Sequence, residues 1–247
     1  MTNDRSTKGS RVSRGAISEL FTKAGERITF RKFSPRDSDH QLTAGTVECY
    51  RLVFGGAPWN EWVKCEICDK HWGINDHAEL AKLGYRHCGS PVVDFWPRHE
   101  VYSDLLNEIT SETLCRLAIR NAEEVVGFCW GYPIPPKKLE KKLGIPIAAS
   151  LRRTFGPLTH VGYQDEVGVI AEMRGEKVGK ALNAARINDF VHRGLTVAIS
   201  RARRTPEPSV TYLWYTGKLG YRVVAEYPEE DGRVILARNL EGLQQLL

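Results

Sequence analysis

The stretch from residue 167 to residue 182 constrains the fold of this chain more than any other part of it. Its start, Val167-Gly168-Val169-Ile170, is apolar and largely β-branched, which is typical of a short strand. The next residues, Arg174-Gly175-Glu176-Lys177-Val178-Gly179, predict a tight turn with two glycines, and a helix follows. Such a turn directs free backbone N–H groups and the positive end of the helix dipole to one place. That place suits a phosphate or pyrophosphate, with positive charge from Arg174 and Lys177 beside it; the alternative is that the glycines only shape the turn.

Length and composition describe an ordinary globular chain. With 247 residues it can bury the core of one large domain, or of one domain with a small insertion. No apolar run approaches the roughly 18–20 residues that a membrane span requires, and residues 1–14 lack the apolar core of an export signal. We therefore expect a cytoplasmic protein with no membrane partner. The net charge of +5 suits an anionic cofactor and is too small to argue for nucleic acid.

The predicted element order mixes helices with single strands and with two strand hairpins, and an N-terminal segment and one unusual stretch stand apart from it. We expect residues 1–26 to be flexible or to contain a short helix at 15–24, and we treat residues 59–97 as an insertion. The predicted strands cover residues 27–32, 114–120, 125–132, 158–169, 195–200, 221–227 and 233–239, and the predicted helices cover 41–54, 101–109, 137–143, 176–193 and 209–219.

Two motifs in this order resemble motifs of the GNAT superfamily of acyl-CoA N-acyltransferases. The phosphate loop of that family has the form Arg/Gln-x-x-Gly-x-Gly/Ala. Here Arg174 takes the first position and Gly179 the last, while Lys177 stands where the family has its middle glycine. Downstream, Lys218-Leu219-Gly220-Tyr221 resembles the end of the family's late helix, which closes in Lys-Leu-Gly and an aromatic residue. Both motifs lie in the order that the family uses.

The resemblance covers residues 27–58 and 99–240, which we take as parts of one domain spanning 27–240. It implies an α+β fold, an αβα sandwich around a mixed, mostly antiparallel sheet. A V-shaped cofactor cleft would split that sheet between the strand ending at Val169 and the strand beginning near Leu195, with pantetheine lying there like an extra strand. The residues that the resemblance assigns to the coenzyme are Val167, Gly168, Val169, Arg174, Gly175, Glu176, Lys177, Val178, Gly179 and Lys180.

By resemblance, the chain is an acetyl-CoA-dependent N-acetyltransferase. It would pass the acetyl group directly to a primary amine of a small molecule or a protein, so that the enzyme supplies positioning and proton management. The resemblance leaves the acceptor open and is compatible with a homodimer. An alternative from another class is a zinc-ribbon adaptor that binds nucleic acid or protein through a catalytically inactive GNAT-like domain. Lys177 and the basic clusters at residues 137–142 and 201–204 favour that alternative.

The transfer needs a base, because an amine must lose its proton before it attacks a thioester. Asp165 and Glu166 are the carboxylates of the central strand, and strand alternation predicts that only one of them faces the cleft. We choose Glu166, because Gln164 and Gly168 share its face and leave a polar path. The alternative for either carboxylate is a solvated position or a structural ion pair.

The acid–base positions of the family are matched only in part. Some members carry a glutamate six residues before the equivalent of Val169, and that position is Tyr163 here. The general acid for the leaving thiolate is often a tyrosine on the late helix, and the expected place falls on Thr216. We choose the adjacent Tyr215, with Tyr212 one turn earlier; the alternative is that both tyrosines are core aromatics.

The inserted residues 59–97 are rich in Trp, Cys, His and Gly and have poor apolar periodicity. Cys65-Glu66-Ile67-Cys68 has the spacing of a zinc knuckle, and Tyr85-Arg86-His87-Cys88-Gly89 resembles a second knuckle whose first cysteine is replaced. In a chain expected in the cytoplasm, this pattern favours a metal over disulfides. We predict a zinc-ribbon-like segment with a structural Zn²⁺ ion. The assigned ligands are Cys65, Cys68, His87 and Cys88, with His71 as the alternative to His87; the other possibility is a ribbon that has lost its metal and packs around its tryptophans.

Overall fold

The structure is a computed structural model that describes residues 18–228 and 231–242. The flexible segment expected at residues 1–14 lies outside the described residues. Within the described part, every helix is too short or too polar to pass through a bilayer.

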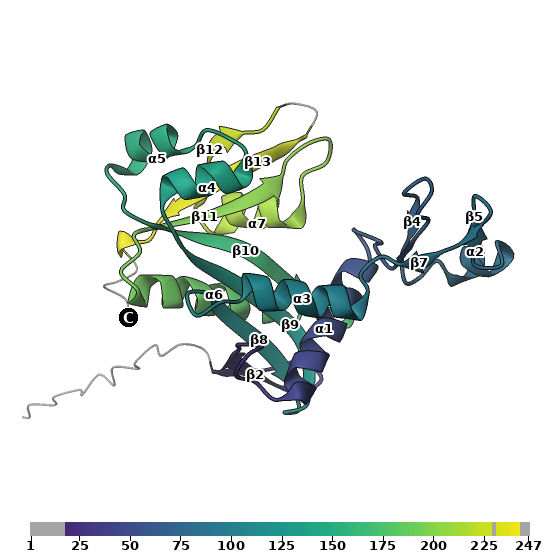
Figure 1. The fold of residues 1–247 in the computed structure, drawn as a ribbon. Helices are drawn as coiled ribbons and strands as arrows, with labels where there is room; N and C mark the ends of the chain where they lie inside the picture. Colours follow the sequence, from purple (N-terminus) through teal and green to yellow (C-terminus); the bar gives the residue numbers. More distant parts are fainter. Residues whose placement is uncertain (1–17, 229–230, 243–247) are drawn as a thin grey trace, which may run out of the picture.

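One eight-stranded sheet runs through the main body of the molecule (Figure 1). Its strand order is β1-β2-β8-β9-β10-β11-β13-β12; β10 and β11 run parallel, and the other neighbouring strands in it run antiparallel. The strands are β1 (Glu19–Phe21), β2 (Arg27–Lys32), β8 (Leu114–Arg120), β9 (Glu124–Ile134), β10 (Val161–Val169), β11 (Val197–Arg203), β12 (Arg222–Glu226) and β13 (Arg233–Asn239).

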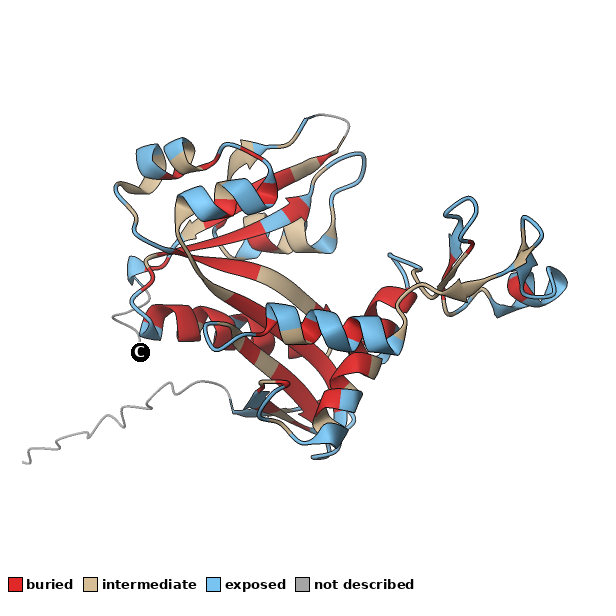
Figure 2. Ribbon diagram, in the orientation of Figure 1, coloured by how far each residue is buried: buried red, intermediate tan, exposed pale blue. Residues whose placement is uncertain are grey.

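Helices cover both faces of this sheet (Figure 1). On β11, Val197 and Ile199 pack in one cluster with α4 and α5, whereas Ala198 and Ala202 pack on the opposite face with α6 and α7. The described sheet is therefore the centre of an αβα sandwich, and Figure 2 shows its strands as the most buried part of the molecule. The predicted fold class is confirmed. The helices are α1 (His40–Gly55), α3 (Arg98–Glu108), α4 (Pro136–Leu143), α5 (Ala148–Phe155), α6 (Val178–His192) and α7 (Val210–Lys218).

The sheet opens between its two parallel strands. β10 and β11 pair only from Gly162↔Ala198 to Gln164↔Ser200, although β10 continues to Val169 and β11 to Arg203. Beyond Gln164 each strand keeps only its outer neighbour, so the two halves of the sheet diverge (Figure 1). This produces the V-shaped gap that the family resemblance implies, with β10 and α6 on one side and β11 and α7 on the other.

The inserted segment forms a small unit that extends from the end of α1 (Figure 1, right). Its own core consists of Cys65, Trp72 and Leu80, which are at most 2% exposed. Such a core is too small to order this many residues by burial alone. The unit contains a three-stranded sheet of β4 (His71–Trp72), β3 (Val63–Lys64) and β7 (Val93–Asp94), a pair of β5 (Arg86–His87) and β6 (Ser90–Pro91), and the helix α2 (His77–Lys82).

Two elements differ from the sequence-based expectation. Residues Glu19–Phe21 form a strand where we expect a short helix, because they pair with β2 and Leu20 packs against the main core. The helix α5 was not expected, because it is only eight residues long and lies in a stretch, residues 133–157, that is rich in proline and lysine.

Candidate active site

The turn between β10 and α6 gathers unpaired backbone donors. It passes through a short 3-10 turn, η1 (Ala171–Met173), and both Gly175 and Lys177 then adopt left-handed conformations, with φ of 86° and 66°. Alternating conformations of this kind turn successive N–H groups toward one point and create an anion-binding nest. In the part of the chain that the structure describes, the following N–H groups donate no hydrogen bond: Gly175, Lys177, Val178, Gly179 and Lys180.

Side chains brace this turn from outside. The Arg174 guanidinium donates to the carbonyls of Val169 (3.3 Å) and Ala57 (2.6 Å), and so ties the turn to the end of α1. The Glu176 carboxylate accepts from the backbone N–H of Lys23 (2.8 Å). The structure thus places the two side chains in bracing contacts and leaves the backbone donors free. Lys177 occupies its left-handed position at a cost of roughly 1–2 kcal/mol for a residue other than glycine, and its side chain is exposed.

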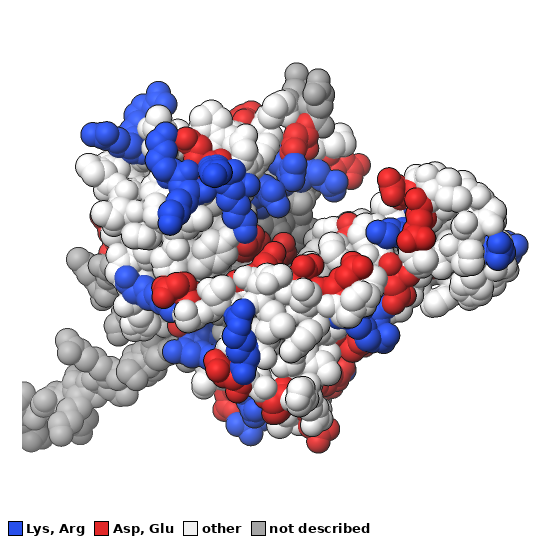
Figure 3. Space-filling model, in the orientation of Figure 1, with Lys and Arg blue, Asp and Glu red and all other residues white. Residues whose placement is uncertain are grey.

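A pocket of about 580 Å³ occupies the gap between β10 and β11. Its volume lies within the range of about 300–1,000 Å³ that is usual for small-ligand sites. On the face drawn in Figure 3, acidic side chains gather in the hollow between α3 and α4. Residues from both strands, α7 and the inserted unit line the pocket, among them Gln164, Asp165, Glu166, Val167, Ser200, Arg201, Arg203, Tyr215, Trp59, Glu61 and His71.

A β-bulge changes how the two carboxylates of β10 face this pocket. Opposite β9, Gln164 pairs with Gly131 and Glu166 pairs with Trp130, so Asp165 is an extra residue in β10. Strand alternation is interrupted there, and both Asp165 and Glu166 line the pocket. The expectation that only one of them faces the cleft is therefore wrong, because it assumes an uninterrupted strand.

The two carboxylates differ in their partners. The Asp165 carboxylate accepts from Lys142 Nζ (2.9 Å) and from the Tyr132 hydroxyl (3.0 Å), which makes it part of a structural ion pair. The Glu166 side chain makes no hydrogen bond to any residue that the structure describes. Burial raises the pKa of Glu166 to about 8, with further contributions from Asp165 and Glu108. A carboxyl group with this pKa is suited to proton transfer near neutral pH.

Tyr215 lies against the inner wall of the same pocket and is fully buried. Its hydroxyl donates to Asn183 Oδ1 (3.0 Å) and accepts from Arg186 Nη2 (3.1 Å). Burial raises the pKa of Tyr215, so the phenol keeps its proton at neutral pH. The family position Thr216 instead donates its hydroxyl to the carbonyl of Tyr212 (2.7 Å). The role of Tyr215 as an acid stays a prediction.

Sequence reasoning missed a buried polar network beneath the pocket. It joins Arg186 to Gln164, Asn183 and Tyr215, and Gln164 Nε2 donates to the Tyr221 hydroxyl at 2.6 Å. Arg186 and Asn183 are almost fully buried in α6, although helices usually bury apolar side chains. Asn183 and Arg186 stand among mostly apolar residues in the sequence of α6, and this pattern was the signal that could have revealed the network.

The tryptophans at positions 59, 62, 96 and 130 differ in whether a ligand in this pocket could reach them. Trp59 lines the pocket and is 42% exposed. Trp130 is buried in the main core, and Trp96 packs against that core. Trp62 lies under the Arg51 guanidinium, 4.8 Å from it, at the junction with the inserted unit. One of the four is therefore available to a ligand in this pocket.

The inserted unit brings together the four predicted metal ligands. The donor atoms of Cys65, Cys68, His87 and Cys88 all lie within 4.8 Å of one another. Cys68 Sγ is 3.6 Å from Cys88 Sγ, and His87 Nδ1 is 3.5 Å and 3.2 Å from these two sulfur atoms. A tetrahedral zinc ion bound at about 2.3 Å keeps its sulfur ligands about 3.8 Å apart. The donor set and its spacing therefore fit zinc.

The surroundings of His87 and His71 show which of these two candidate histidines lies with the cysteine ligands. His87 stands in the cluster, whereas His71 Nδ1 lies 3.4 Å from the Asp69 carbonyl and the His71 ring packs edge-on against Phe95. The His71 side chain also lines the cleft pocket. Contact with His87 lowers the pKa of the Cys65 thiol to about 6, whereas contact with Cys68 raises the pKa of Cys88 to about 11.

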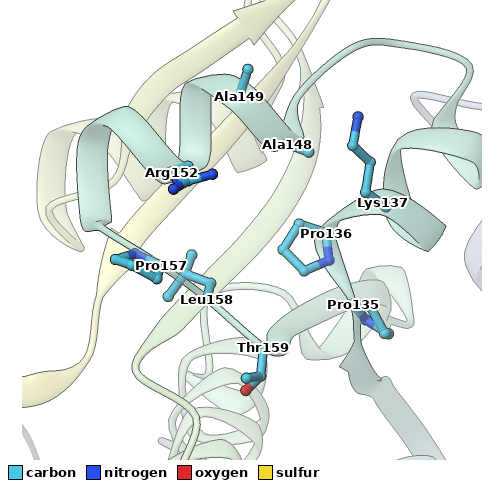
Figure 4. A pocket seen from close by; sticks show the side chains of 9 residues that line it. All are labelled: Pro135, Pro136, Lys137, Ala148, Ala149, Arg152, Pro157, Leu158 and Thr159. Carbon is cyan, nitrogen blue, oxygen red and sulfur yellow. The ribbon is translucent and has the colours of Figure 1, made fainter.

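A second hollow of about 630 Å³ lies between α4 and α5 (Figure 4). Pro135, Pro136 and Pro157 form much of its wall, with Lys137 and Arg152 at its edge. It contains none of the residues that the sequence assigns to coenzyme, catalysis or metal.

Comparison with known proteins identifies the fold. No family model and no curated protein matches the sequence. The structure is similar to a putative acetyltransferase of the GNAT family from Desulfovibrio desulfuricans, with a TM-score of 0.50, 12% identity, and coverage of 86% of this chain and 99% of that one. It is also similar to an uncharacterized protein from Bacillus halodurans (TM-score 0.50, 10% identity, 92% of each chain). The PaiA N-acetyltransferase from Thermoplasma acidophilum, solved with coenzyme A, has a TM-score of 0.47 at 13% identity, over 86% of this chain and 98% of that one. The chain has the fold of the GNAT acetyltransferases.

Proposed function

We propose that the protein is an acetyl-CoA-dependent N-acetyltransferase that acts on a primary amine. The observation that carries this proposal is the row of unpaired N–H groups where β10 and β11 diverge. An anion bound there receives several backbone hydrogen bonds and the field of the α6 dipole. The gap between the strands then accepts a long, thin thioester arm that leads from the anion toward Glu166.

In this proposal the main chain holds the coenzyme. The pyrophosphate contacts the free N–H groups of Gly175 and of residues 177–180, and the pantetheine pairs with β10 around Val167, Gly168 and Val169. Lys177 and Lys180 are exposed at the start of α6 and add positive charge. Arg174 and Glu176 support the turn through the contacts described above.

Glu166 and Tyr215 manage the protons of the transfer. Glu166, as a carboxylate, takes one proton from the ammonium form of the acceptor, and the neutral amine nitrogen then attacks the thioester carbon. The C–S bond breaks as Tyr215 gives its proton to the departing thiolate, and the nitrogen of the new amide loses its second proton to solvent. Solvent returns the proton from Glu166 to Tyr215, so the enzyme ends in its starting state. Both residues line the same pocket, which supports this division of roles.

Acetyl-CoA turnover tests the proposed function directly. We expect free thiol to appear when the protein is mixed with acetyl-CoA and a panel of amines that includes polyamines, aminoglycosides and peptides, and we expect the acetylated amine in the mass spectrum. We also expect acetyl-CoA to raise the melting temperature. If acetyl-CoA binds and no amine is modified, the catalytic assignment fails. Stabilisation by an oligonucleotide, with a steep dependence on salt, would instead support an adaptor.

We propose that the cluster of Cys65, Cys68, His87 and Cys88 holds a structural Zn²⁺ ion. The three thiolates and one imidazole are a common donor set for structural zinc, and their spacing supports it. The ion would order a unit whose own apolar core has three buried residues. We further propose that residues 27–240 form the transferase domain and that residues 59–97 are inserted in it; because β1 pairs with β2, the sheet of this domain begins before residue 27.

Metal analysis of histidine variants checks the zinc proposal. We expect about one equivalent of zinc in the purified protein and in His71→Ala, which leaves all four ligands in place. His87→Ala is expected to lose most of the metal and to expose the unit to proteolysis. Less than about half an equivalent in the unchanged protein, or equal zinc in the two variants, would contradict the assignment.

A further inference from the structure

Arg186 is a buried cation with no carboxylate partner among the described residues. It is 1% exposed, and its acceptors are two backbone carbonyls, two side-chain amide oxygens and one hydroxyl. Its Nε is buried and has no hydrogen-bond partner among the described residues. Burying a charge without an opposite charge is costly. A buried charge that destabilises the fold in this way is a candidate for a role in function.

The hydrogen bonds of Arg186 are concentrated at the bulge of β10. Its Nη1 donates to the carbonyls of Trp130 (2.9 Å) and Glu166 (2.6 Å), which are the first facing pair after the extra residue Asp165. The guanidinium therefore joins β9 and β10 at the point where the bulge disturbs their ladder. Gly131 permits the close approach of β9 and β10 here, because a Cβ there would lie 2.4 Å from the Tyr163 carbonyl and 2.9 Å from Phe190 Cζ; it would also lie 3.3 Å from Arg186 Cδ.

The other nitrogen connects the bulge to the far side of the cleft. Arg186 Nη2 donates to Gln164 Oε1 (3.0 Å) just before the bulge and to the Tyr215 hydroxyl (3.1 Å) on α7. One guanidinium thus contacts the strand that carries Glu166 and the helix that carries Tyr215. These elements belong to the two halves of the sheet that diverge at the cleft.

We propose that Arg186 is a positioning residue for the transfer reaction, which holds the bulge of β10 and fixes Glu166 and Tyr215 relative to each other across the cleft. This inference rests on the proposed function. The inference explains why a charged side chain is buried at this position. An apolar side chain cannot donate hydrogen bonds to two carbonyls, side-chain amides and a phenol, and a lysine lacks the planar fork that donates to all of them at once.

The charge of Arg186 also acts on Glu166. Arg186 and Arg201 favour the carboxylate form of Glu166, whereas Asp165 and Glu108 oppose it. Loss of the guanidinium charge therefore raises the pKa of Glu166 further, and the pH at which the base becomes available moves upward. The titratable and charged groups around Glu166 are Asp165 on its own strand, Glu108 on α3, Arg186 on α6, Arg201 and Arg203 on β11, Tyr215 on α7, Tyr50 on α1, Asp231 and Arg233 near β13, and Glu61 and His71 from the inserted unit.

Two substitutions separate the charge from the geometry. In Arg186→Met we expect the rising limb of the kcat/KM profile to move to higher pH and kcat to fall at least about tenfold. In Arg186→Lys, which keeps the charge but not the planar fork, we expect the limb to stay near its original pH while kcat remains at least about tenfold low. Arg116→Met is the matched control, because it removes another guanidinium that contacts α6, through Asp189 at 2.6 Å. That control is expected to lower the melting temperature and leave the limb in place.

A direct titration of the Glu166 carboxyl makes the outcome independent of turnover. The ¹³C signal of labelled glutamate, assigned through Glu166→Gln, is expected to titrate at higher pH in Arg186→Met than in the unchanged protein or in Arg116→Met. An equal shift in the Arg116 control, or no shift in Arg186→Met, would overturn the inference. If Arg186→Met does not fold, unchanged kcat in Arg186→Lys overturns it. If the protein acetylates no amine, the proposed function is wrong. A shift in this titration would then still report contact between Arg186 and Glu166, but it would have no meaning for catalysis.

Discussion

Glu166→Gln is expected to lower kcat/KM by about 10²–10⁴-fold, the usual contribution of a general base. Glutamine keeps the size of the side chain and cannot accept the proton of the amine. The acetyl-CoA affinity should change little, because in the proposed site the main chain of β10 and of the turn holds the coenzyme. Steady-state kinetics and calorimetric binding with acetyl-CoA measure the two effects separately.

The pH profile identifies which carboxylate acts. With the pKa of Glu166 at about 8, the base is mostly protonated at pH 7, so kcat/KM should rise through about pH 8 and level off above it. Asp165→Asn is the matched control on the neighbouring residue. Because Asp165 raises the pKa of Glu166, its neutralisation should move the limb to lower pH. A limb that persists unchanged in Glu166→Gln would show that another group is the base.

The second large effect is expected from Gly179→Asp, which places a negative charge in the first turn of α6. Two unit charges about 4 Å apart repel by about 4 kcal/mol near a protein surface, so we expect acetyl-CoA to bind at least ~100-fold more weakly. The fold itself should survive, because an acidic side chain at a helix N-terminus interacts favourably with the dipole. Calorimetry and thermal melting distinguish lost binding from lost stability.

Gly179→Ala is the control for this substitution. A Cβ at this position would meet Val169 Cγ2 at 3.6 Å, an ordinary contact, and alanine favours a helix more than glycine does. We expect an unchanged or higher melting temperature and nearly unchanged acetyl-CoA affinity. If both variants bind acetyl-CoA as the unchanged protein does, the anion does not lie at the start of α6.

The turn could be predicted from the sequence because it depends on a local pattern, and the fold followed from the family resemblance of two short motifs. A strand, a glycine turn and a helix follow one another between Val167 and His192, and each is visible in the order of residues. The paired knuckles of the inserted unit were equally local. The choice between His87 and His71 as a ligand does not depend on a local pattern, because it is decided by how the β5–β6 pair folds back on the first knuckle.

The polar network beneath the cleft could not be predicted in the same way. Gln164, Arg186 and Tyr215 come from one strand and two helices, and their hydrogen bonds depend on the bulge at Asp165. A bulge adds one residue without a strong local signal, and it reverses the faces of all residues on one side of it. Sequence alternation therefore placed Asp165 and Glu166 on opposite faces, whereas the structure turns both to the pocket.

A crystal structure with bound coenzyme A tests the central claim most directly. We expect its diphosphate on the N–H groups between Gly175 and Lys180, and its thiol arm between β10 and β11, ending beside Glu166. A coenzyme bound elsewhere on the molecule, with these N–H groups in contact only with water, would contradict the proposed site and the reaction derived from it.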